Sequence, residues 1–552
     1  MTQSSDVRHL ADTLVARILE ASPFTGTNLG LREYDSLVPD ASRAAEDRFA
    51  EDVAAIDVQA RTLVPASDED VVTLGVIRSW CYTSQLDVAN RHTEYAVTAM
   101  PIAGPPVLFA TLARTAIVDA QAASDYISRL RGSATWLDQT TERLREGKAR
   151  GRYPVGLLVD QAIGWAEATL ATPVPPALAA PQPPEGWDGT SAWRAEIEDA
   201  ATGIQAALGH WRDELAELRP NARGDAEVGI GAIPGGAEDY ERDIAVHTTL
   251  TLDADEIHAI GLAEVDRLEQ QLLDLGATLG LTSLDAVRAA MRASASVLDA
   301  SASLEVAQNA IKRAKAIAHE LMPAPLPEPC AVEPMPPTVA ESGMAPHYTR
   351  PKLDGSRAGT YWFNTLRPTA GTGWDLEAVA FHEAVPGHHS QLARLQRLEG
   401  LPLLQQLSQT VHSEGWGLYA ERLAGEFGLY SDARAEIGAA YMELHPAVRL
   451  VVDTGMHASG WSRTQAIAYI TEHMALPETF LINEIDRYIV WPGQALAYLV
   501  GQREILRLRD EARTALGTRF DLPSFHAAIL DSGSVPMPVL AAIVGRHITS
   551  HG

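Results

Sequence analysis

Cysteine is scarce in this sequence, and its scarcity limits the kinds of site that the chain can form. Cys81 and Cys330 are the only two cysteines among 552 residues. Their separation matches none of the closely paired spacings that thiolate metal sites use. We therefore expect both thiols to be reduced and structural.

Basic residues are outnumbered, which argues against one large class of partner. Lys and Arg total 44 against 72 Asp and Glu, so the formal net charge is -28. Because nucleic-acid binding depends on Lys and Arg that neutralise backbone phosphates, we expect no nucleic-acid partner.

Long apolar runs are absent as well. The sequence has no uninterrupted apolar stretch of about 18 residues, which a membrane-spanning helix needs. Its start lacks the basic and then apolar design of a secretion signal. Instead, Leu10, Leu14, Ile18 and Leu19 mark one face of an amphipathic helix. We expect no membrane partner and a cytoplasmic location.

Two proline-rich stretches divide the chain. Residues 172–189 and 322–338 contain too much proline for a helix or a central strand. They separate an N-terminal helical region (1–171), a second helical region (190–321) and a third region (339–552). We expect the third region to carry the catalytic chemistry and all three to form one integrated unit.

Helical patterning dominates these regions. Asp253 with Glu256 and Ser462 with Gln465 have the spacing of helix-capping pairs. The segment GTYWFNT (359–365) is rich in aromatic and β-branched residues and predicts a strand. The sequence therefore predicts a mostly α fold with a small β-sheet.

The stretch FHEAVPGHHSQ (381–391) is similar to the metal-binding helix of zinc peptidases, but its spacing differs. Such helices carry two histidines on one face, beside a glutamate that takes a proton from the metal-bound water. Asp375 can cap a helix that contains His382 and Glu383. In a regular helix His388 and His389 would lie about 9 and 10.5 Å further along the axis. That is too far for two ligands at about 2.1 Å from one ion, so a regular helix is excluded.

Pro386 and Gly387 provide the interruption that the spacing requires. Proline has no N–H for the carbonyl four residues earlier, and glycine accepts backbone angles that other residues avoid. The helix must bulge or break, and a two-residue bulge would bring His388 to the usual position of the second ligand. His389 would then point away or support a ligand from behind. The alternative is an ordinary helix end with a Pro-Gly stop, which leaves the grouping of Glu383 with three histidines to coincidence.

Glu414 is the candidate for a third ligand. The segment 403–423 has an apolar helical stripe, and Glu414 falls on it. A carboxylate that faces a core needs an arginine, a proton or a metal ion. Gly415 and Gly417 would allow another helix to approach closely. From spacing alone, a structural Glu–Arg pair explains the pattern equally well.

Four longer segments resemble one bacterial family. They are HEAVPGHHSQ, HSEGWGLYAERL, DTGMHASGWSRTQAIAYI and RYIVWPGQALAYLVG, and together they resemble the domain of unknown function 885 (DUF885), most clearly from about residue 240 onward. That family is similar to the angiotensin-converting-enzyme and carboxypeptidase-Taq types of helical, gluzincin-like zinc peptidase. The resemblance implies a two-lobed helical fold with its sheet near the metal site. It also implies that His382, His388 and Glu414 hold Zn²⁺ and that Glu383 is the general base.

The same resemblance suggests two further catalytic residues. Tyr488 follows Arg487, as in converting-enzyme-like peptidases, where the phenol donates a hydrogen bond to the oxyanion of the tetrahedral intermediate. The alternative is an ordinary helical tyrosine.

Four more residues are candidates for binding or support. Asp453 and His457 share a helix face, and could support the metal ligands, contact substrate or form a surface pair. If the strand in 359–365 binds an extended substrate along its edge, Tyr361 and Asn364 lie near the site.

The sequence therefore predicts a zinc-dependent hydrolase of amide bonds in short peptides or peptide-like metabolites, of carboxypeptidase or dipeptidase type. One alternative is a catalytically silent helical scaffold or binding protein, and another is a metal hydrolase of a non-peptide amide. The intact set of His382, Glu383 and Glu414 favours an enzyme.

Overall fold

The computed structural model describes residues 3–295, 300–322, 330–335, 340, 345–353, 355, 357–364 and 372–552. In this part of the chain the protein is mostly α-helical with a small β-sheet, as the sequence predicts. Short 3-10 turns link the main elements: η1 (Arg32–Tyr34), η2 (His92–Glu94), η3 (Arg219–Asn221), η4 (Asp225–Glu227), η5 (Ile230–Ala232), η6 (Arg394–Arg397), η7 (Leu403–Gln406), η8 (Gln494–Leu496) and η9 (Gly517–Arg519).

The N-terminal helices complete the largest apolar core. They are α1 (Gln3–Ala21), α2 (Pro23–Leu29), α3 (Arg43–Thr62) and α4 (Asp68–Asn90). The stripe of Leu10, Leu14, Ile18 and Leu19 on α1 is buried in this core, as the amphipathic pattern predicts.

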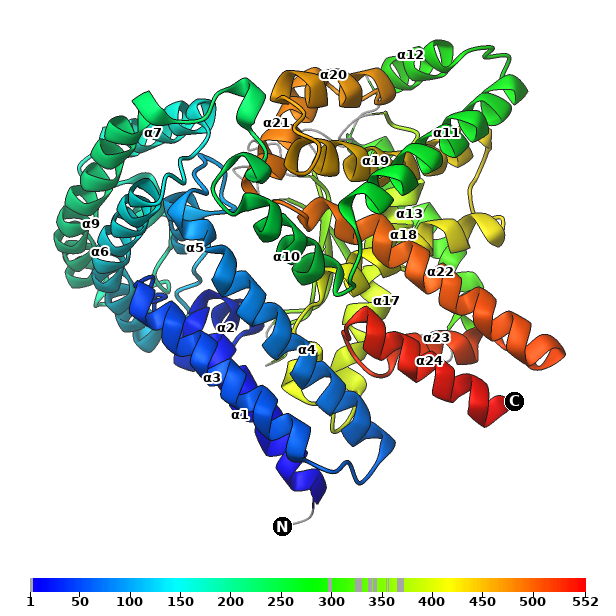
Figure 1. Ribbon diagram of the computed structural model, residues 1–552, viewed down its shortest axis with the longest axis horizontal. Helices are drawn as coiled ribbons and strands as arrows, with labels where there is room; N and C mark the ends of the chain where they lie inside the picture. Colours follow the sequence, from blue (N-terminus) through cyan, green and yellow to red (C-terminus); the bar gives the residue numbers. More distant parts are fainter. Residues whose placement is uncertain are drawn as a thin grey trace.

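A second core lies at one side of the molecule, on the left in Figure 1. It contains α5 (Gly104–Ala113), α6 (Ala120–Ala149), α7 (Gly156–Leu170), α8 (Pro176–Ala179) and α9 (Thr190–Leu218). Helix α9 packs along both α6 and α7. The proline-rich segment 172–189 therefore joins helices that share one core, while the proposed domain boundaries themselves stay a prediction.

The remaining long helices share the largest core with the N-terminal ones. They are α10 (Gly236–Thr248), α11 (Ala254–Thr278), α12 (Leu284–Ala295), α18 (Thr410–Glu426), α19 (Ala433–His457), α20 (Arg463–His473), α21 (Glu478–Val490), α22 (Ala497–Leu516), α23 (Leu522–Leu530) and α24 (Met537–His551). Helix α11 packs against α19, and α18 against α22. A Cβ on Gly415 would lie 2.6 Å from Cα of Gly501, so α18 and α22 cross at two glycines, which confirms the close approach expected at Gly415.

The small sheet lies beside the shorter helices of the third region. The sheet contains β1 (Ala331–Pro334), β2 (His347–Thr349) and β3 (Thr360–Phe363), in the order β1-β3-β2. Strand β3 confirms the strand expected in 359–365, and it pairs parallel to β1 and antiparallel to β2. Around the sheet are α13 (Ala300–Ala316), α14 (Ala318–Leu321), α16 (Leu376–Glu383) and α17 (His388–Leu392).

The strand order corrects one expectation. Because β3 lies between β1 and β2, both of its edges are occupied, and no substrate can add along that strand. The unpaired edges belong to β1 and β2. Pro334 ends the edge strand β1, which agrees with the exclusion of proline-rich sequence from central strands.

The capping predictions are confirmed at two helices and fail at a third. The Asp253 side chain accepts from the backbone N–H groups of Asp255 and Glu256, and Ser462 and Gln465 form a complete capping box. Asp375 precedes α16 but makes no capping hydrogen bond. Its side chain instead lines a buried cavity described below.

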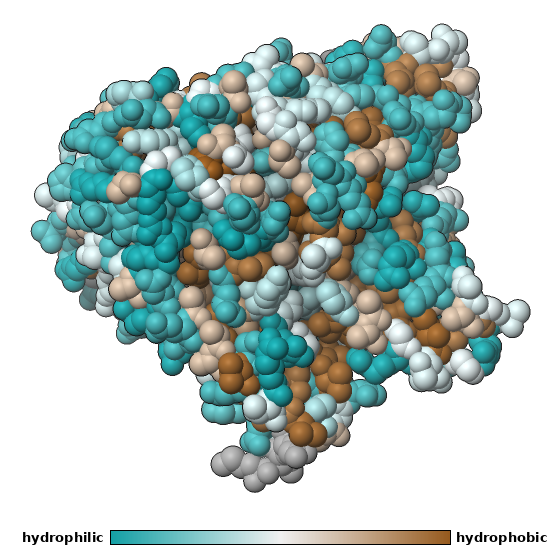
Figure 2. Space-filling view, viewed as in Figure 1, coloured by the Kyte–Doolittle hydropathy of each residue, from teal (hydrophilic) through white to brown (hydrophobic). Residues whose placement is uncertain are grey.

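The surface in Figure 2 is hydrophilic over most of the visible face, with apolar residues grouped in hollows near its middle. Among the described helices, none combines the length and apolarity that crossing a bilayer requires. Cys81 and Cys330 are buried and form no disulfide, as their spacing predicts.

Candidate metal centre

The first helix of the site ends where the sequence predicts an interruption. Helix α16 stops at Glu383, residues 384–387 form a turn with a cis peptide bond between Val385 and Pro386, and α17 begins at His388. The helix therefore ends at this turn, and a second helix begins after it. The expected two-residue bulge within one helix is therefore wrong. The expected position of His388 is nevertheless observed, because its ring lies beside that of His382.

Gly387 makes the tight return of the chain possible. Its N–H donates to the carbonyl of Phe381 at 3.0 Å, and a Cβ at this position would lie 1.9 Å from the carbonyl oxygen of His382. Only glycine fits so close to another backbone. As a result the imidazoles of His382 and His388 lie with ring centroids 4.7 Å apart, at an interplanar angle of 88°.

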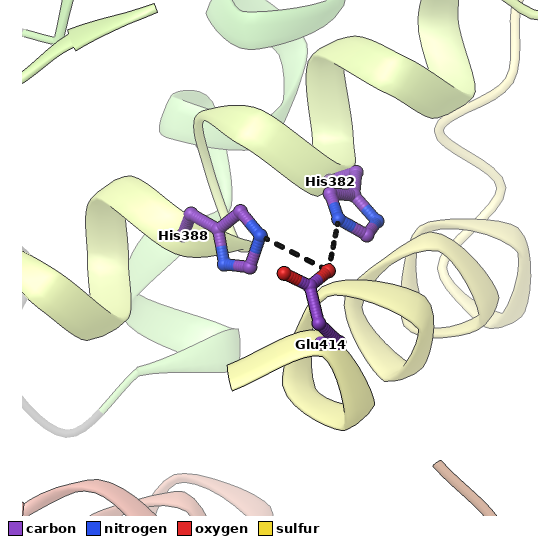
Figure 3. A group of neighbouring side chains, drawn as sticks. All are labelled: His382, His388 and Glu414. Carbon is purple, nitrogen blue, oxygen red and sulfur yellow. Dashed lines mark ion pairs between the residues drawn. The ribbon is translucent and has the colours of Figure 1, made fainter. Parts of the chain in front are cut away.

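Glu414 completes the group from the neighbouring helix α18 (Figure 3). Its Oε2 lies 3.5 Å from Nε2 of His382 and 3.7 Å from Nε2 of His388, and all three donor atoms lie within 4.8 Å of one another. Two ligands of a tetrahedral zinc ion, each about 2.1 Å from it, are about 3.4 Å apart. The two carboxylate–imidazole separations are close to this value, and two imidazoles with one carboxylate form a donor set that Zn²⁺ uses.

The charges at this centre are strongly coupled. Burial alone would raise the pKa of Glu414, but hydrogen bonds from His382 and His388 lower it below its usual range. Burial alone would lower the pKa of His382, yet its hydrogen bonds with Glu414 and Glu421 raise it well above 6.5. A structural Glu–Arg pair is not what holds Glu414, because its partners here are the two imidazoles.

Glu421 is a residue of this centre that the sequence analysis missed. Its Oε1 accepts from Nδ1 of His382 at 2.7 Å, so the Nε2 of that ring is free to face Glu414. Burial raises the pKa of Glu421 to about 6, although the contact with His382 opposes this. Its position seven residues after Glu414 places both on one face of α18, and that spacing was the available signal.

Gly417, on the same helix, leaves room for the ring of His382. A Cβ on Gly417 would lie 2.5 Å from Cε1 of that imidazole. The expectation of close approach at Gly417 is therefore confirmed.

Glu383 is held by the sheet. The backbone N–H of Tyr348, on β2, donates to its Oε2 at 2.8 Å. The Tyr348 hydroxyl in turn lies 3.0 Å from Nδ1 of His389. His389 is thus buried and turned away from His382, Glu414 and His388, as one of the two expected arrangements requires.

A cavity of about 340 Å³ opens at this centre. Its walls include five residues predicted for the site, which are His382, Glu383, His388, Glu414 and Tyr361. Among the further polar residues that line it, and that the sequence analysis did not assign to the site, are Asp375, His445, Arg449 and Tyr498. They come from α16's start, α19 and α22, so only the tertiary structure brings them together.

Tyr488 and Arg487 do not belong to the described cavity wall. The Tyr488 hydroxyl donates to Oε2 of Glu484 at 2.6 Å and accepts from Nε of Arg449 at 2.8 Å. Arg487 donates to Glu484 and to Gln494. Their polar groups are used in a buried ion-pair network, and the expected contact with the oxyanion stays a prediction.

Asp453 and His457 are buried away from the metal centre, so neither forms a surface pair. Oδ1 of Asp453 accepts from the hydroxyl of Tyr240 at 2.6 Å and from the N–H of Gly493 at 3.1 Å. Nδ1 of His457 accepts from the N–H of Ile230, and Nε2 donates to the carbonyl of Tyr488. Neither residue lines the described cavity, and their expected roles in substrate binding and ligand support stay predictions.

Tyr361 and Asn364, the two candidates from the strand segment, have different surroundings. Tyr361 is fully buried, lines the cavity and has a hydroxyl group with no hydrogen-bond partner in the described structure. Asn364 is buried and donates to the carbonyl of Ala340 at 3.2 Å, outside the described cavity wall. Asn364 therefore secures the backbone near the sheet, and only Tyr361 faces the site.

Comparisons with known proteins agree with this architecture. A family described as "Bacterial protein of unknown function (DUF885)" matches residues 23–544. No curated protein is significantly similar to the sequence. The crystal structure of a "putative lipoprotein" from Colwellia psychrerythraea is 25% identical over 100% of both chains, with a TM-score of 0.90. A "putative lipoprotein of unknown function" from Shewanella oneidensis is 17% identical over 97% of this chain and 98% of its own, with a TM-score of 0.76.

Proposed function

The chain belongs to DUF885, a family of bacterial proteins of unknown function, and we propose that it is a zinc-dependent hydrolase of amide bonds in short peptides or peptide-like metabolites. The observation that supports this most strongly is the convergence of His382, His388 and Glu414 in a cavity that Glu383 also lines. Three protein ligands with space beside them are typical of catalytic zinc sites, whereas structural sites use four.

The roles of the residues follow from their contacts. A zinc ion at this centre would supply an acidified water and polarise the substrate carbonyl. Glu383 takes the proton of that water, and the N–H of Tyr348 fixes the orientation of its carboxylate. Glu421 holds the Nδ1 proton of His382, which keeps Nε2 available as a donor to the metal.

Tyr498 is a second candidate for the role that the sequence suggested for Tyr488. Its phenol ring lines the cavity, and the guanidinium of Arg449 lies 4.7 Å from the ring centroid. A phenol in this position donates a hydrogen bond to the oxyanion that forms when water attacks the carbonyl. Tyr488 contributes indirectly, because it accepts a hydrogen bond from Arg449, a residue of the cavity wall.

The cellular location stays a prediction. The sequence led to the expectation of a cytoplasmic protein, whereas both solved structures are described as those of lipoproteins. That description weighs against a cytoplasmic location.

Two measurements on the purified protein test the proposal. Elemental analysis of protein prepared without added zinc should find about one zinc per chain, and this zinc should be lost in His382→Ala. A mixed peptide library read by mass spectrometry should be cleaved by the wild type. Glu383→Gln should keep zinc and lose turnover by a factor on the order of 10² to 10⁴.

The possible failures of this test lead to different conclusions. Absence of bound zinc, together with no cleavage, would favour the catalytically silent scaffold. Bound zinc with no cleavage of any peptide would favour a non-peptide amide as substrate.

A further inference from the structure

Five residues that line the cavity carry a buried polar atom with no hydrogen-bond partner among the described residues: Tyr361, Asp375, His388, Glu421 and His445. Asp375 is 4% exposed and Tyr361 is 0% exposed, and both line the cavity together with Glu383. In the described structure, Oδ1 of Asp375 and the hydroxyl of Tyr361 have no hydrogen-bond partner. Buried polar atoms usually have one, so Oδ1 of Asp375 and the hydroxyl of Tyr361 offer an acceptor and a donor to a polar group of a ligand in this cavity.

The chemistry of the pair defines that group. A carboxylate only accepts hydrogen bonds, and two arginines with ion pairs in this region are used elsewhere, Arg313 by Glu377 and Arg449 by Glu484. Burial raises the pKa of Asp375 to about 6, although hydrogen bonds from its own backbone and from Thr372 and Gly373 favour the charged form. These hydrogen bonds leave Oδ1 without a donor, and an ammonium group would both donate to it and neutralise the carboxylate.

The position of Asp375 relates this partner to the metal centre. Asp375 precedes α16 and stands seven residues before His382. At about 1.5 Å of rise per residue the two are about 10 Å apart along the helix axis. An extended peptide spans about 3.3 to 3.6 Å per residue, so the cation lies two to three residues from a carbonyl at the metal centre.

We propose that Asp375, together with the hydroxyl of Tyr361, binds the free α-amino group of a short peptide substrate. Hydrolysis then requires an unblocked amino terminus. This inference rests on the proposed hydrolase function and adds to it the class of substrate. A lysine side chain carries the same ammonium chemistry, and the test separates these two sources.

The first test compares three peptides that differ only at the amino terminus and the first residue. They are a peptide with a free amino terminus, its N-acetylated form, and an N-acetylated form with lysine at the first position. The wild type should prefer the free amino terminus by a factor on the order of 10 to 100 in kcat/KM, the range for a hydrogen bond to a charged group. Preference for the acetylated lysine peptide would instead assign the subsite to a side chain and overturn the proposal.

Substitution of Asp375 tests whether this residue causes the preference for a free amino terminus. Asp375→Asn keeps the shape but removes the charge, so it should abolish the preference, chiefly through KM for the free peptide, and leave zinc content unchanged. Tyr361→Phe should reduce the preference less. Asp285→Asn is the matched control, because Asp285 is 96% exposed and far from the cavity wall. If Asp375→Asn lowers kcat/KM equally for the free and the N-acetylated peptide, the proposal is overturned.

A binding measurement separates this inference from the proposed function. Titration calorimetry of trialanine and N-acetyl-trialanine into Glu383→Gln, with and without zinc, reports recognition without turnover. Selective binding of trialanine to Glu383→Gln, and the loss of this binding in the double variant that also carries Asp375→Asn, supports the inference even if no peptide is hydrolysed. Equal binding of both peptides, or binding of neither, would overturn it.

Discussion

At the scale of single residues, the candidate metal centre depends on the hydrogen bond between Nδ1 of His382 and the carboxylate of Glu421. Glu421 accepts from Nδ1 of His382 and is 4% exposed, so the ring of His382 cannot turn without leaving a buried carboxylate unpaired. Carboxylates in this position orient the histidine and make it a better donor. If the candidate centre binds a metal ion, its affinity would therefore depend partly on Glu421, which is not one of the three candidate ligands.

We expect Glu421→Gln to weaken zinc binding by a factor on the order of 10 to 100, because the amide holds the imidazole less strongly than the carboxylate does. Competition with a chromophoric chelator measures the affinity directly. Glu399→Gln, at an exposed position, is the control and should bind zinc as the wild type does. Unchanged affinity in Glu421→Gln would mean that His382 is oriented by its packing alone.

Asp453 gives a prediction about pH and stability. Burial raises the pKa of Asp453 from 3.8 to about 7, so the folded state holds this proton more tightly than the unfolded state. The stability that this group contributes is complete below about pH 4 and is lost as the pH rises through about 7. Asp453→Asn keeps an oxygen acceptor for Tyr240 and Gly493 but never ionises.

We therefore expect Asp453→Asn to gain stability relative to the wild type on going from about pH 5 to about pH 8, by several kcal/mol at most. Urea unfolding of both proteins at the two pH values measures the difference, and other titrating groups cancel in the comparison. A relative loss of stability at the higher pH would show that the Asp453 charge is better compensated than its buried contacts indicate.

At the scale of elements, the break between α16 and α17 is what converts an unsuitable spacing into a metal site. The turn of residues 384–387 brings the start of α17 back beside the end of α16, and His388 is the first residue of the new helix. Helix α18 then supplies Glu414 from the side. Three short pieces of backbone thus present one donor each.

We expect Gly387→Ala to displace this turn, because the added Cβ would lie 1.9 Å from the carbonyl oxygen of His382. The variant should lose zinc and unfold at a lower temperature than the wild type. The matched control is Gly209→Ala on α9, where an added Cβ meets no atom within 4 Å and a small gain in stability is expected. Normal zinc content in Gly387→Ala would show that the turn can move without disturbing His388.

The parts of the site that depend on local spacing were predictable from the sequence. His382, Glu383 and Glu414 each lie on a recognisable helical pattern, and the Pro-Gly pair showed that the helix could not continue. The form of the break was not predictable, since bulge and break both bring His388 back. Asp375 has the residue type and position of a helix cap, and the sequence alone does not distinguish that role from the ligand binding proposed above.

Residues that reach the site through tertiary structure were not predictable from one sequence. Tyr498 and Arg449 lie on different helices and meet only because α19 and α22 pack together. Tyr488 fits the sequence pattern of an oxyanion donor, yet its hydroxyl bonds Glu484 and Arg449. The order of the strands likewise depends on pairing between distant segments, and a strand's own sequence does not reveal whether it is central.

At the scale of the whole molecule, the candidate metal centre lies between the small sheet and helices that share the largest apolar core. The sheet, α16, α18 and the C-terminal helices surround it, and the side chains of His382, His388 and Glu414 are 11%, 9% and 23% exposed. The N-terminal helices α1, α3 and α4 share the apolar core of the C-terminal helices. The site therefore depends on segments from both ends of the chain.

This enclosure predicts a limit on substrate size. A cavity of about 340 Å³ cannot admit a folded domain, and an extended peptide needs about 3.3 to 3.6 Å of depth for each residue that enters. We expect kcat/KM to be highest for peptides of about three to six residues and to fall as the peptide lengthens. A native globular protein should not be cut. Peptides of graded length and one small disulfide-bonded protein, incubated with the enzyme and followed by mass spectrometry, measure the dependence. Cleavage of the native protein at the rate of the short peptides would mean that the helices around His382 and Glu414 open widely, and the size limit would then be wrong.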